Sequence, residues 1–315
     1  MTTILAGDIG GTKSLLGMFE DGELRQQRRL ANADFSGLSG VIAAFLADIG
    51  VSGSRFDGGC LAVAGPVADD GVSATLTNLP WSIDSAALAA RFGLPVLGLV
   101  NDFAAAALGA VTSAPEQLLT LQQGDPLTTA PRLVVGAGTG LGMALVLPEP
   151  DGWRIVPTEG GHAGFAPADA EQIALWDFIH ARHGRVTWER VVSGPGLAAV
   201  HAFLGGETTV SDPAAIGQLA LADPSSSAGR ALELFLAAYG AFAGDMALAS
   251  LSRGGVYLAG GIAAKVLPAL RQGAFLPAFN AKAEHAAIMA RMPVHVALDP
   301  NLGLRGAARL AMKRI

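Results

Sequence analysis

The chain has 315 residues, about the length of two average domains, and it is apolar: 51% of its residues are hydrophobic and 15% are charged. Its net charge is −6 and it has no long basic segment, so we expect no nucleic-acid partner. A membrane-spanning helix needs about 18 consecutive apolar residues. The uncharged runs 133–148 and 191–206 are shorter and contain glycines, so we also expect no membrane partner.

The first residues and the cysteine content bear on location. Met1-Thr2-Thr3-Ile4 carries no basic region and no cleavage site, so no signal or transit peptide is expected. The single cysteine, Cys60, excludes an intramolecular disulfide and a cysteine-based zinc site, and it indicates a reducing compartment. We therefore predict a cytoplasmic protein.

The chain opens with a β-meander and not with a β-α-β unit. Ile4–Ile9 and Ser14–Phe19 are predicted strands joined by a glycine turn, and Asp21-Gly22 lets Leu24–Leu30 pair back. The next predicted elements are a helix over Ser36–Ile49, a strand over Gly59–Ala64, a helix over Ser82–Phe92, a strand over Pro95–Val100 and a helix over Phe103–Ala110. Ser82 is the expected N-cap of its helix, and Gly93 follows that helix.

The segment Val111–Pro131 is richer in Pro, Thr and Gln, which indicates a domain boundary near it. Beyond it we predict strands over 133–136, 142–147, 254–259 and 293–298, and helices over 169–183, 195–204, 212–222, 227–252 and 301–312. The expected organisation is a small α/β domain of residues 1–110 plus 301–315 and a large α/β domain of residues 111–300.

One structural motif occurs twice in the sequence. Residues 6–12 and 135–142 each form a strand, a glycine-rich tight turn with a threonine, and a second strand. One copy in each half predicts two related α/β domains. Glycine turns let backbone N–H groups approach phosphate closely. Neither turn leads into a helix, as the dinucleotide-binding fingerprint requires, so the pair suits a clamp on the β- and γ-phosphates.

Six segments together resemble the bacterial glucokinase family of actin-like sugar kinases, over about residues 4–310. In chain order they are Gly7-Asp8-Ile9-Gly10-Gly11-Thr12, Asn101-Asp102-Phe103, Gly138-Thr139-Gly140-Leu141-Gly142, Glu159-Gly160-Gly161-His162, Ser193-Gly194-Pro195-Gly196 and Leu258-Ala259-Gly260-Gly261-Ile262. The cysteine-rich zinc motif of the related repressor and kinase group is absent, so the resemblance is to the zinc-free branch. It implies an α/β fold of two actin-like (ribonuclease H-like) domains around a deep cleft.

The resemblance implies two cofactors, ATP and Mg²⁺. It assigns ATP to Gly7, Asp8, Gly10, Gly11, Thr12, Gly138, Thr139, Gly140, Gly260 and Gly261. Asp8 is also implied to hold the metal, although by itself it fits an Asx turn equally well. Gly260-Gly261 by itself fits a simple turn into a helix as well as a nucleotide contact.

Asp102 lies at a strand-to-helix junction, where an aspartate can be a helix N-cap or a functional carboxylate. The sequence around Asp102 does not decide between these two roles. The resemblance implies that Asp102 is the catalytic carboxylate, which orients the attacking hydroxyl and takes its proton.

The resemblance also implies that the sugar is bound by Asn101, Asp102, Glu159, His162 and Glu189. Glu159 and His162 have a spacing that also occurs in metal sites, but no further ligand follows nearby. Glu189 by its own pattern is an ordinary surface charge.

The implied function is a glucokinase that transfers the γ-phosphoryl group of ATP to the 6-hydroxyl of glucose, working as a homodimer. Kinases for another hexose on the same fold remain an alternative, and the residues do not exclude ADP or polyphosphate as donor. A sugar-responsive transcription regulator would need a helix-turn-helix before the first strand. A protein-binding ATPase of the same fold would not need the polar set around Asn101 and Glu159.

Overall fold

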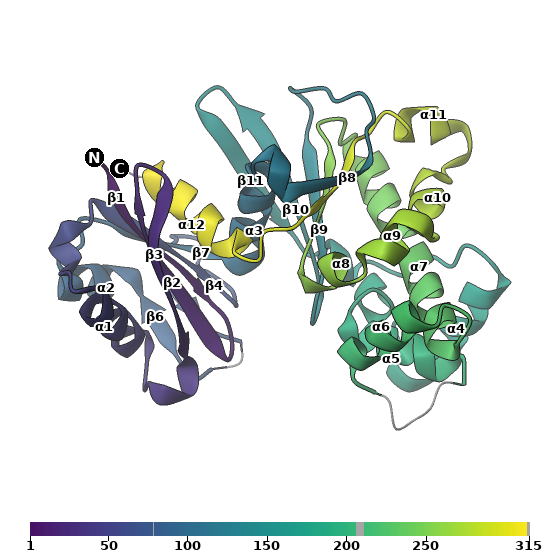
Figure 1. Cartoon of the computed structure of the whole chain (residues 1–315), viewed down its shortest axis with the longest axis horizontal. Helices are drawn as coiled ribbons and strands as arrows, with labels where there is room; N and C mark the ends of the chain where they lie inside the picture. The colour runs from purple at the N-terminus through teal and green to yellow at the C-terminus, as the bar shows by residue number, and fades with distance from the viewer. Residues whose placement is uncertain (78, 206–210, 314–315) are drawn as a thin grey trace. The chain divides into compact units, whose positions relative to one another are not determined.

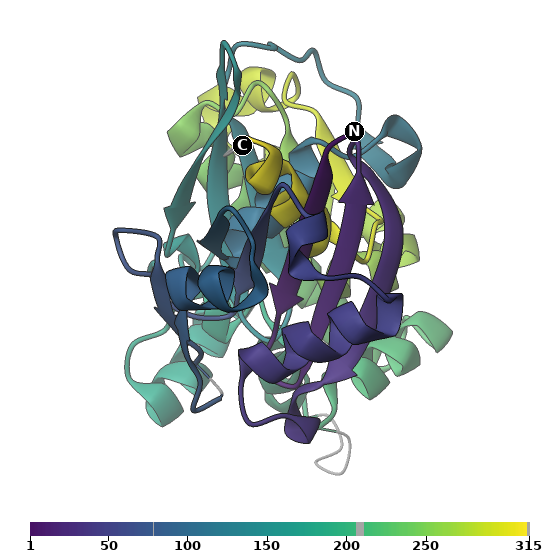
Figure 2. The ribbon, with the colours of Figure 1, turned by 90° about the vertical axis from the view of Figure 1, so that its left-hand side faces the viewer.

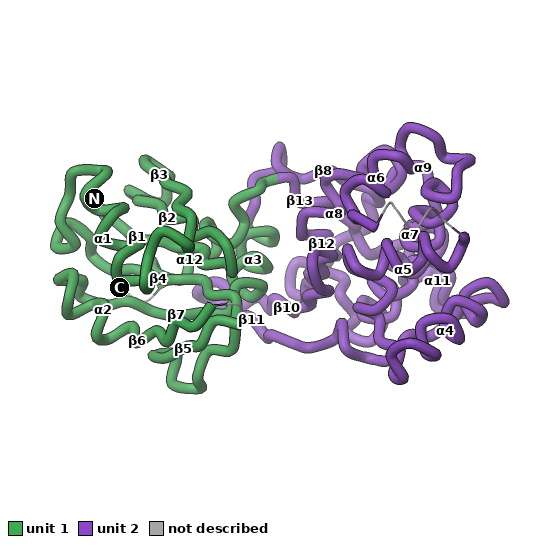
Figure 3. Tube along the Cα trace, turned by 90° about the horizontal axis from the view of Figure 1, so that it is seen from below, with its two compact units in different colours: residues 1–112, 299–315 green, residues 113–298 purple. Residues whose placement is uncertain are grey.

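The protein is described here from a computed structural model, which covers residues 1–77, 79–205 and 211–313. The chain forms two compact units (Figures 1 and 3). Unit 1 consists of Met1–Thr112 and Asp299–Ile315, and unit 2 of Ser113–Leu298.

Unit 1 is built on a five-stranded sheet with the order β3-β2-β1-β4-β7. Its strands are β1 (Thr3–Ile9), β2 (Lys13–Glu20), β3 (Glu23–Ala31), β4 (Gly58–Val63) and β7 (Leu97–Asn101). β1 pairs antiparallel with β2 and parallel with β4. The predicted opening β-meander is therefore confirmed.

Helices cover both faces of this sheet (Figures 1 and 2). They are α1 (Leu38–Ile49), α2 (Ser85–Phe92), α3 (Asp102–Val111) and α12 (Leu302–Met312). Leu5 and Ile9 of β1 pack in one cluster with α1, whereas Ile4 and Ala6 pack in another with α3 and α12. Alternate side chains of β1 thus enter opposite cores, so the strand is apolar throughout.

The sheet of unit 2 repeats this arrangement. Its order is β11-β10-β9-β12-β13-β8, with β8 (Leu118–Gln122), β9 (Arg132–Ala137), β10 (Leu141–Glu149), β11 (Gly152–Thr158), β12 (Val256–Ala259) and β13 (Val294–Ala297). β9 pairs antiparallel with β10 and parallel with β12, as β1 does with its neighbours. The related α/β units predicted from the repeated turns are confirmed, and β8 adds an antiparallel edge.

The helices of unit 2 are α4 (Ala170–His183), α5 (Gly194–Phe203), α6 (Pro213–Ala222), α7 (Ser227–Ser250), α8 (Gly261–Lys265), α9 (Leu267–Gln272), α10 (Phe275–Asn280) and α11 (Ala286–Met289).

The remaining elements are short. Two short strands, β5 (Ser73–Thr75) and β6 (Ser82–Asp84), pair in unit 1. The 3-10 turns are η1 (Asn32–Asp34), η2 (Gly53–Arg55), η3 (Pro115–Gln117), η4 (Gly160–His162), η5 (Trp188–Arg190) and η6 (Ala283–His285).

Within the described residues, α7 alone is long and apolar enough to cross a membrane by length and composition. However, 72% of its apolar window is buried inside the protein. Tyr239 and Phe242 of this helix are fully buried, and Tyr239 packs edge-on against Phe275. These contacts make α7 the central core helix of unit 2.

The helix predicted to start at Ser82 starts later. Ser82–Asp84 forms β6 because Ile83 is buried in the unit 1 core, and the helix begins at Ser85. Asp84, and not Ser82, is the N-cap, since its carboxylate accepts the Ala87 N–H at 2.9 Å. Gly93 ends the helix in the left-handed conformation, as expected.

Helices α3 and α12 pack with their backbones in direct contact. A methyl group on Gly306 of α12 would overlap the Ala105 carbonyl oxygen of α3. We predict that Gly306→Ala lowers the free energy of unfolding by about 1–3 kcal/mol, because backbone cannot move aside as a flexible side chain can. Chemical denaturation measures this.

Gly217 in α6 is the matched control, because a methyl group there meets no atom within 4 Å. Gly217→Ala should leave stability unchanged or raise it by up to about 1 kcal/mol, since alanine is the better helix former. Equal effects of the two substitutions would contradict the close approach of α3 and α12.

Candidate functional site

The first glycine turn joins β1 to β2 and is braced by Asn32. The Asn32 side chain donates to the Gly10 carbonyl at 2.8 Å and accepts from the Ser14 hydroxyl at 2.7 Å. Its backbone N–H donates to the Thr12 carbonyl at 3.0 Å. Asn32 is 2% exposed while Thr12 is exposed, so a buried amide holds a turn whose tip faces solvent.

Gly7 and Gly10 have different surroundings. Gly10 is in the turn, where its N–H donates to the Lys13 carbonyl at 3.0 Å. Gly7 lies within β1, and a methyl group there would come 2.6 Å from a methyl carbon of Leu61. The structure therefore provides a packing reason for glycine at position 7, separate from the predicted nucleotide contact.

Asp8 is a carboxylate largely withdrawn from water at the end of β1. Burial, and secondarily the negative charge of Asp102, raise its pKa to about 6, against an opposing effect of Arg29. Its Oδ2 lies 2.7 Å from where a Cβ of Gly303 would be. The first turn of α12 therefore packs directly on the Asp8 carboxylate, and only glycine leaves room for it.

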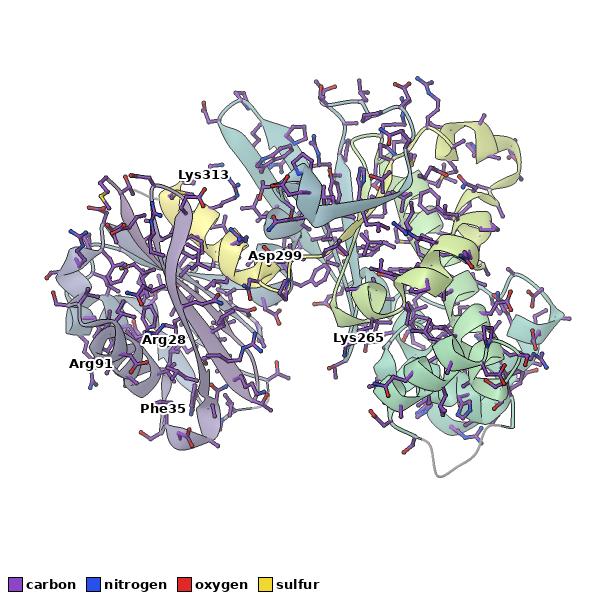
Figure 4. All side chains as sticks on the ribbon, viewed as in Figure 1. Arg28, Phe35, Arg91, Lys265, Asp299 and Lys313 are labelled. Atoms are coloured by element: carbon purple, nitrogen blue, oxygen red, sulfur yellow. The ribbon has the colours of Figure 1, made fainter. Side chains whose placement is uncertain are left out.

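Asp299 fixes the start of α12, the helix whose Gly303 lies against the Asp8 carboxylate. Asp299, labelled in Figure 4, accepts the Asn301 backbone N–H at 2.8 Å and pairs with the Arg305 guanidinium. Its side chain is only 4% exposed. The ion pair thus ties the segment before the helix to its first turn.

Asn101 and Asp102 have different structural roles at the start of α3. The Asn101 side-chain oxygen accepts the Phe103 and Ala104 N–H groups at 3.1 and 3.2 Å, so Asn101 is the N-cap. Asp102 is the first residue of the helix, and one of its oxygens accepts the Phe103 N–H at 2.7 Å. Burial raises the pKa of Asp102 above its usual value. The helix is therefore capped without Asp102.

The second glycine turn joins β9 to β10 in unit 2. The Gly138 N–H donates to the Gly140 carbonyl at 2.8 Å, and the Gly138 carbonyl accepts the Gly194 N–H at 2.7 Å. Thr139 at its tip is exposed, like Thr12 in the first turn. The turn is closed on itself and held to the start of α5.

Gly260 lies beside the base of this turn. It has a φ of +84°, and a methyl group there would come 2.6 Å from the Ala137 carbonyl oxygen. Both facts require glycine. Gly261 begins α8 and faces open space. The structure thus brings Gly260 against Ala137, the residue that precedes Gly138.

Three polar side chains of unit 2 converge. His162 Nε2 lies 3.8 Å from Glu159 Oε2, and His162 Nδ1 lies 3.9 Å from Glu189 Oε1. The second oxygen of Glu189 accepts the Leu141 N–H at 2.8 Å. Glu189 is thus a partly buried, partnered residue and not the plain surface charge that its own sequence pattern suggests.

Of the predicted site residues, unit 1 brings Asp8 and Asp102 together, with Asn101 beside them, and unit 2 brings together Glu159, His162 and Glu189. Sequence reasoning missed Asn32, Gly303 and Asp299. Asp299 precedes a proline and an asparagine, a turn composition that signals the start of a helix. Asn32 and Gly303 act through contacts with residues distant in sequence, which local patterns do not show.

Asp8 is the residue suited to a metal in unit 1. Over the described ranges no group of three His, Cys, Asp or Glu side chains is placed to hold an ion. Mg²⁺ in phosphoryl-transfer sites binds through one or two carboxylates plus phosphate oxygens and waters. A desolvated carboxylate beside a glycine-rich turn fits that mode.

The chain is similar to known proteins over nearly its whole length. A family model described as Glucokinase matches residues 5–314. The chain belongs to the glucokinase family. A relative, the glucokinase of Trichormus variabilis, is 38% identical over an alignment of 344 residues that covers 99% of this chain and 100% of its own. The expected enzyme class, an ATP-dependent hexose kinase, is thereby confirmed.

Solved structures confirm the fold. A glucokinase from an Antarctic psychrotroph superposes with a TM-score of 0.88 at 28% identity, covering 99% of both chains. A ROK family glucokinase from Streptomyces griseus, solved with glucose and AMPPNP, superposes with a TM-score of 0.65 at 21% identity, covering 99% of both chains. The predicted two-domain actin-like fold is therefore correct.

The raised pKa of Asp8 has a consequence for stability. Its pKa is about 6 in the folded protein and near 3.8 in the unfolded chain, so the folded state binds the proton more tightly. The resulting stabilisation is complete below pH 3.8 and is lost as the pH rises through 6. At pH 8 the ionised, desolvated Asp8 therefore destabilises the folded protein.

We predict that Asp8→Asn raises the free energy of unfolding at pH 8 by up to about 3 kcal/mol, since one pKa unit is worth about 1.4 kcal/mol. At pH 4.5, which is still above the unfolded-state pKa of 3.8, the difference between variant and parent should fall to about 1 kcal/mol. Denaturation at both pH values in EDTA measures it. A difference that does not depend on pH would contradict the assigned burial of Asp8.

Proposed function

We propose that this chain is a glucokinase that uses Asp102 to activate the 6-hydroxyl of glucose for attack on the γ-phosphorus of ATP. The observation that carries this assignment is the division of roles at α3: Asn101 caps the helix, so Asp102 is not needed there. The helix start also fixes the orientation of the Asp102 carboxylate, since its Oδ1 accepts the Phe103 N–H.

Asp102 acts by position and charge. Its second oxygen accepts a hydrogen bond from the 6-hydroxyl, orients the attacking lone pair, and takes the proton as the new P–O bond forms and the bond to ADP breaks. Its pKa is raised by burial, which makes it a better proton acceptor than an ordinary aspartate.

The turn residues bind the nucleotide. Backbone N–H groups of Gly11 and Thr12 in unit 1, and of Thr139 and Gly140 in unit 2, are the proposed donors to the phosphates. Gly10 and Gly138 use their own N–H groups to close the two turns, so their proposed role is to let the phosphates approach the backbone closely. Gly260 and Gly261 leave room for the adenosine. Asp8 is the proposed ligand of Mg²⁺, which supplies neutralisation of phosphate charge when bound.

The sugar contacts proposed are Asn101, Asp102, Glu159, His162 and Glu189. A carboxylate accepts from hydroxyl groups, and an imidazole or amide can donate or accept. Such groups reject sugars that lack a matching hydroxyl, because a buried polar group would then stay unpaired. The supporting observation is that three of these five converge within one unit. We also propose that the enzyme is cytoplasmic and forms a homodimer.

The Asp102→Asn variant tests the catalytic role. It keeps an oxygen for the Phe103 N–H but cannot accept the proton, so we expect kcat to fall by at least about 10³. Glucose affinity by calorimetry should change far less, and the circular dichroism spectrum should be unchanged. Turnover within tenfold of the parent would refute the assignment.

Substrate choice is tested with a coupled assay on glucose, mannose, fructose and glucosamine, with ATP, ADP and polyphosphate as donors. We expect the highest kcat/KM with glucose and ATP, by at least about tenfold over the other hexoses, because each mismatched hydroxyl leaves a site group unpaired. A higher kcat/KM with another hexose would assign the chain to that sugar. Rapid ATP hydrolysis without sugar would favour a protein-binding ATPase.

A further inference from the structure

The carboxylate of Glu189 connects the sugar-binding set to the second phosphate turn. Its Oε2 accepts the N–H of Leu141, the residue directly after that turn, at 2.8 Å. Its Oε1 lies 3.9 Å from Nδ1 of His162. A carboxylate offers about four lone-pair directions, so Oε1 remains able to accept a sugar hydroxyl while Oε2 stays bound to the backbone.

The backbone at Gly140 lies directly against the Glu189 carboxylate. A methyl group on Gly140 would come 2.6 Å from Oε2 of Glu189 and 3.4 Å from its carboxyl carbon. The first distance is below any real contact, and Oε2 is the same atom that accepts the Leu141 N–H. A Gly140 side chain would therefore displace the Glu189 carboxylate. In the same turn, a methyl group on Gly138 meets no atom within 4 Å.

The backbone of Glu189 is held in place, so its carboxylate can move away from position 140 only by rotation of its own side chain. Trp188, its neighbour in η5, is 2% exposed and packs edge-on against Phe165 with ring centroids 5.0 Å apart. The Ser193 hydroxyl donates to the Glu189 carbonyl at 2.7 Å. The chain on both sides of Glu189 is thus anchored in the unit 2 core.

We propose that Gly140 is a positioning residue of the sugar site, and that Glu189 couples sugar binding to the shape of the second phosphate turn. The inference rests on the proposed function, because it takes Glu189 as a sugar ligand. A hydroxyl bound at Oε1 holds the carboxylate, and Oε2 then holds the Leu141 N–H and the turn before it. Glycine at position 140 is thus required for sugar binding, although the residue belongs to the second phosphate turn.

Glucose affinity measured by calorimetry without nucleotide separates the two glycines. Gly140→Ala should weaken glucose binding at least about tenfold, because it displaces a ligand of the sugar. Gly138→Ala should alter the KM for ATP while glucose affinity stays within about twofold. Gly217→Ala is the external control, because Gly217 lies in α6, outside the proposed site, and a methyl group there meets no atom within 4 Å; it should change neither constant.

A double-mutant cycle tests whether the effect passes through Glu189. In Glu189→Asp the shorter side chain withdraws the carboxylate from position 140. Adding Gly140→Ala to that variant should weaken glucose binding by less than about twofold, because the clash is already relieved. Additive losses, or equal glucose affinity of the Gly140→Ala and Gly138→Ala variants, would overturn the proposal.

A third variant covers the case that Gly140→Ala does not fold. Glu189→Ala removes the acceptor of the Leu141 N–H, so AMPPNP–Mg²⁺ affinity measured without sugar should fall by about threefold or more. Unchanged nucleotide affinity would overturn the coupling. If the parent enzyme does not phosphorylate glucose, the proposed function fails, whereas the nucleotide effect of Glu189→Ala still reports on the contact with the turn.

Discussion

A carboxylate withdrawn from water at the end of a central strand is the constraint around which unit 1 is arranged. Asp8 is raised in pKa to about 6, mainly by burial. The surrounding structure keeps the carboxylate desolvated. Helix α12 brings Gly303 against it, and Asp299 fixes the start of that helix. A stable fold alone would not require a desolvated acid there, and a carboxylate kept in such a position points to function.

Unit 2 repeats the topology but supplies its carboxylate differently. β9 contains no acidic residue, whereas β1 ends in Asp8-Ile9. Glu189 brings a carboxylate to the second turn from η5, a separate element, and binds the backbone just after the turn. In unit 1 the acid belongs to the strand that leads into the turn, and in unit 2 it comes from a later segment of the chain. In the function we propose, the β-turn-β motif binds metal and phosphate in unit 1, and in unit 2 it links the phosphate turn to the sugar ligand Glu189.

Much of this could be predicted from the sequence where local chemistry decides the structure. The glycine turns, the strand β1 and the strand-to-helix junction at Asn101-Asp102 follow from composition and order, and the family follows from the six ordered segments. The sequence could not say which of Asn101 and Asp102 caps α3, because both side chains can do so and only the geometry separates them. The half-exposed strands β8 and β11 carry polar residues and lack a clear alternation, so they were not predicted. Asn32, Gly303 and the contact between Glu189 and Leu141 join residues that are far apart in the chain, which no local pattern reveals.

The proposed mechanism requires Asp102 to contact the hydroxyl that receives the phosphoryl group. A crystal structure of the enzyme with glucose and AMPPNP–Mg²⁺ would show this contact. We expect the Asp102 oxygen not bound to the Phe103 N–H to lie about 2.6–3.2 Å from the 6-hydroxyl oxygen of glucose. A 6-hydroxyl bound by another carboxylate, with Asp102 turned away from the sugar, would contradict it.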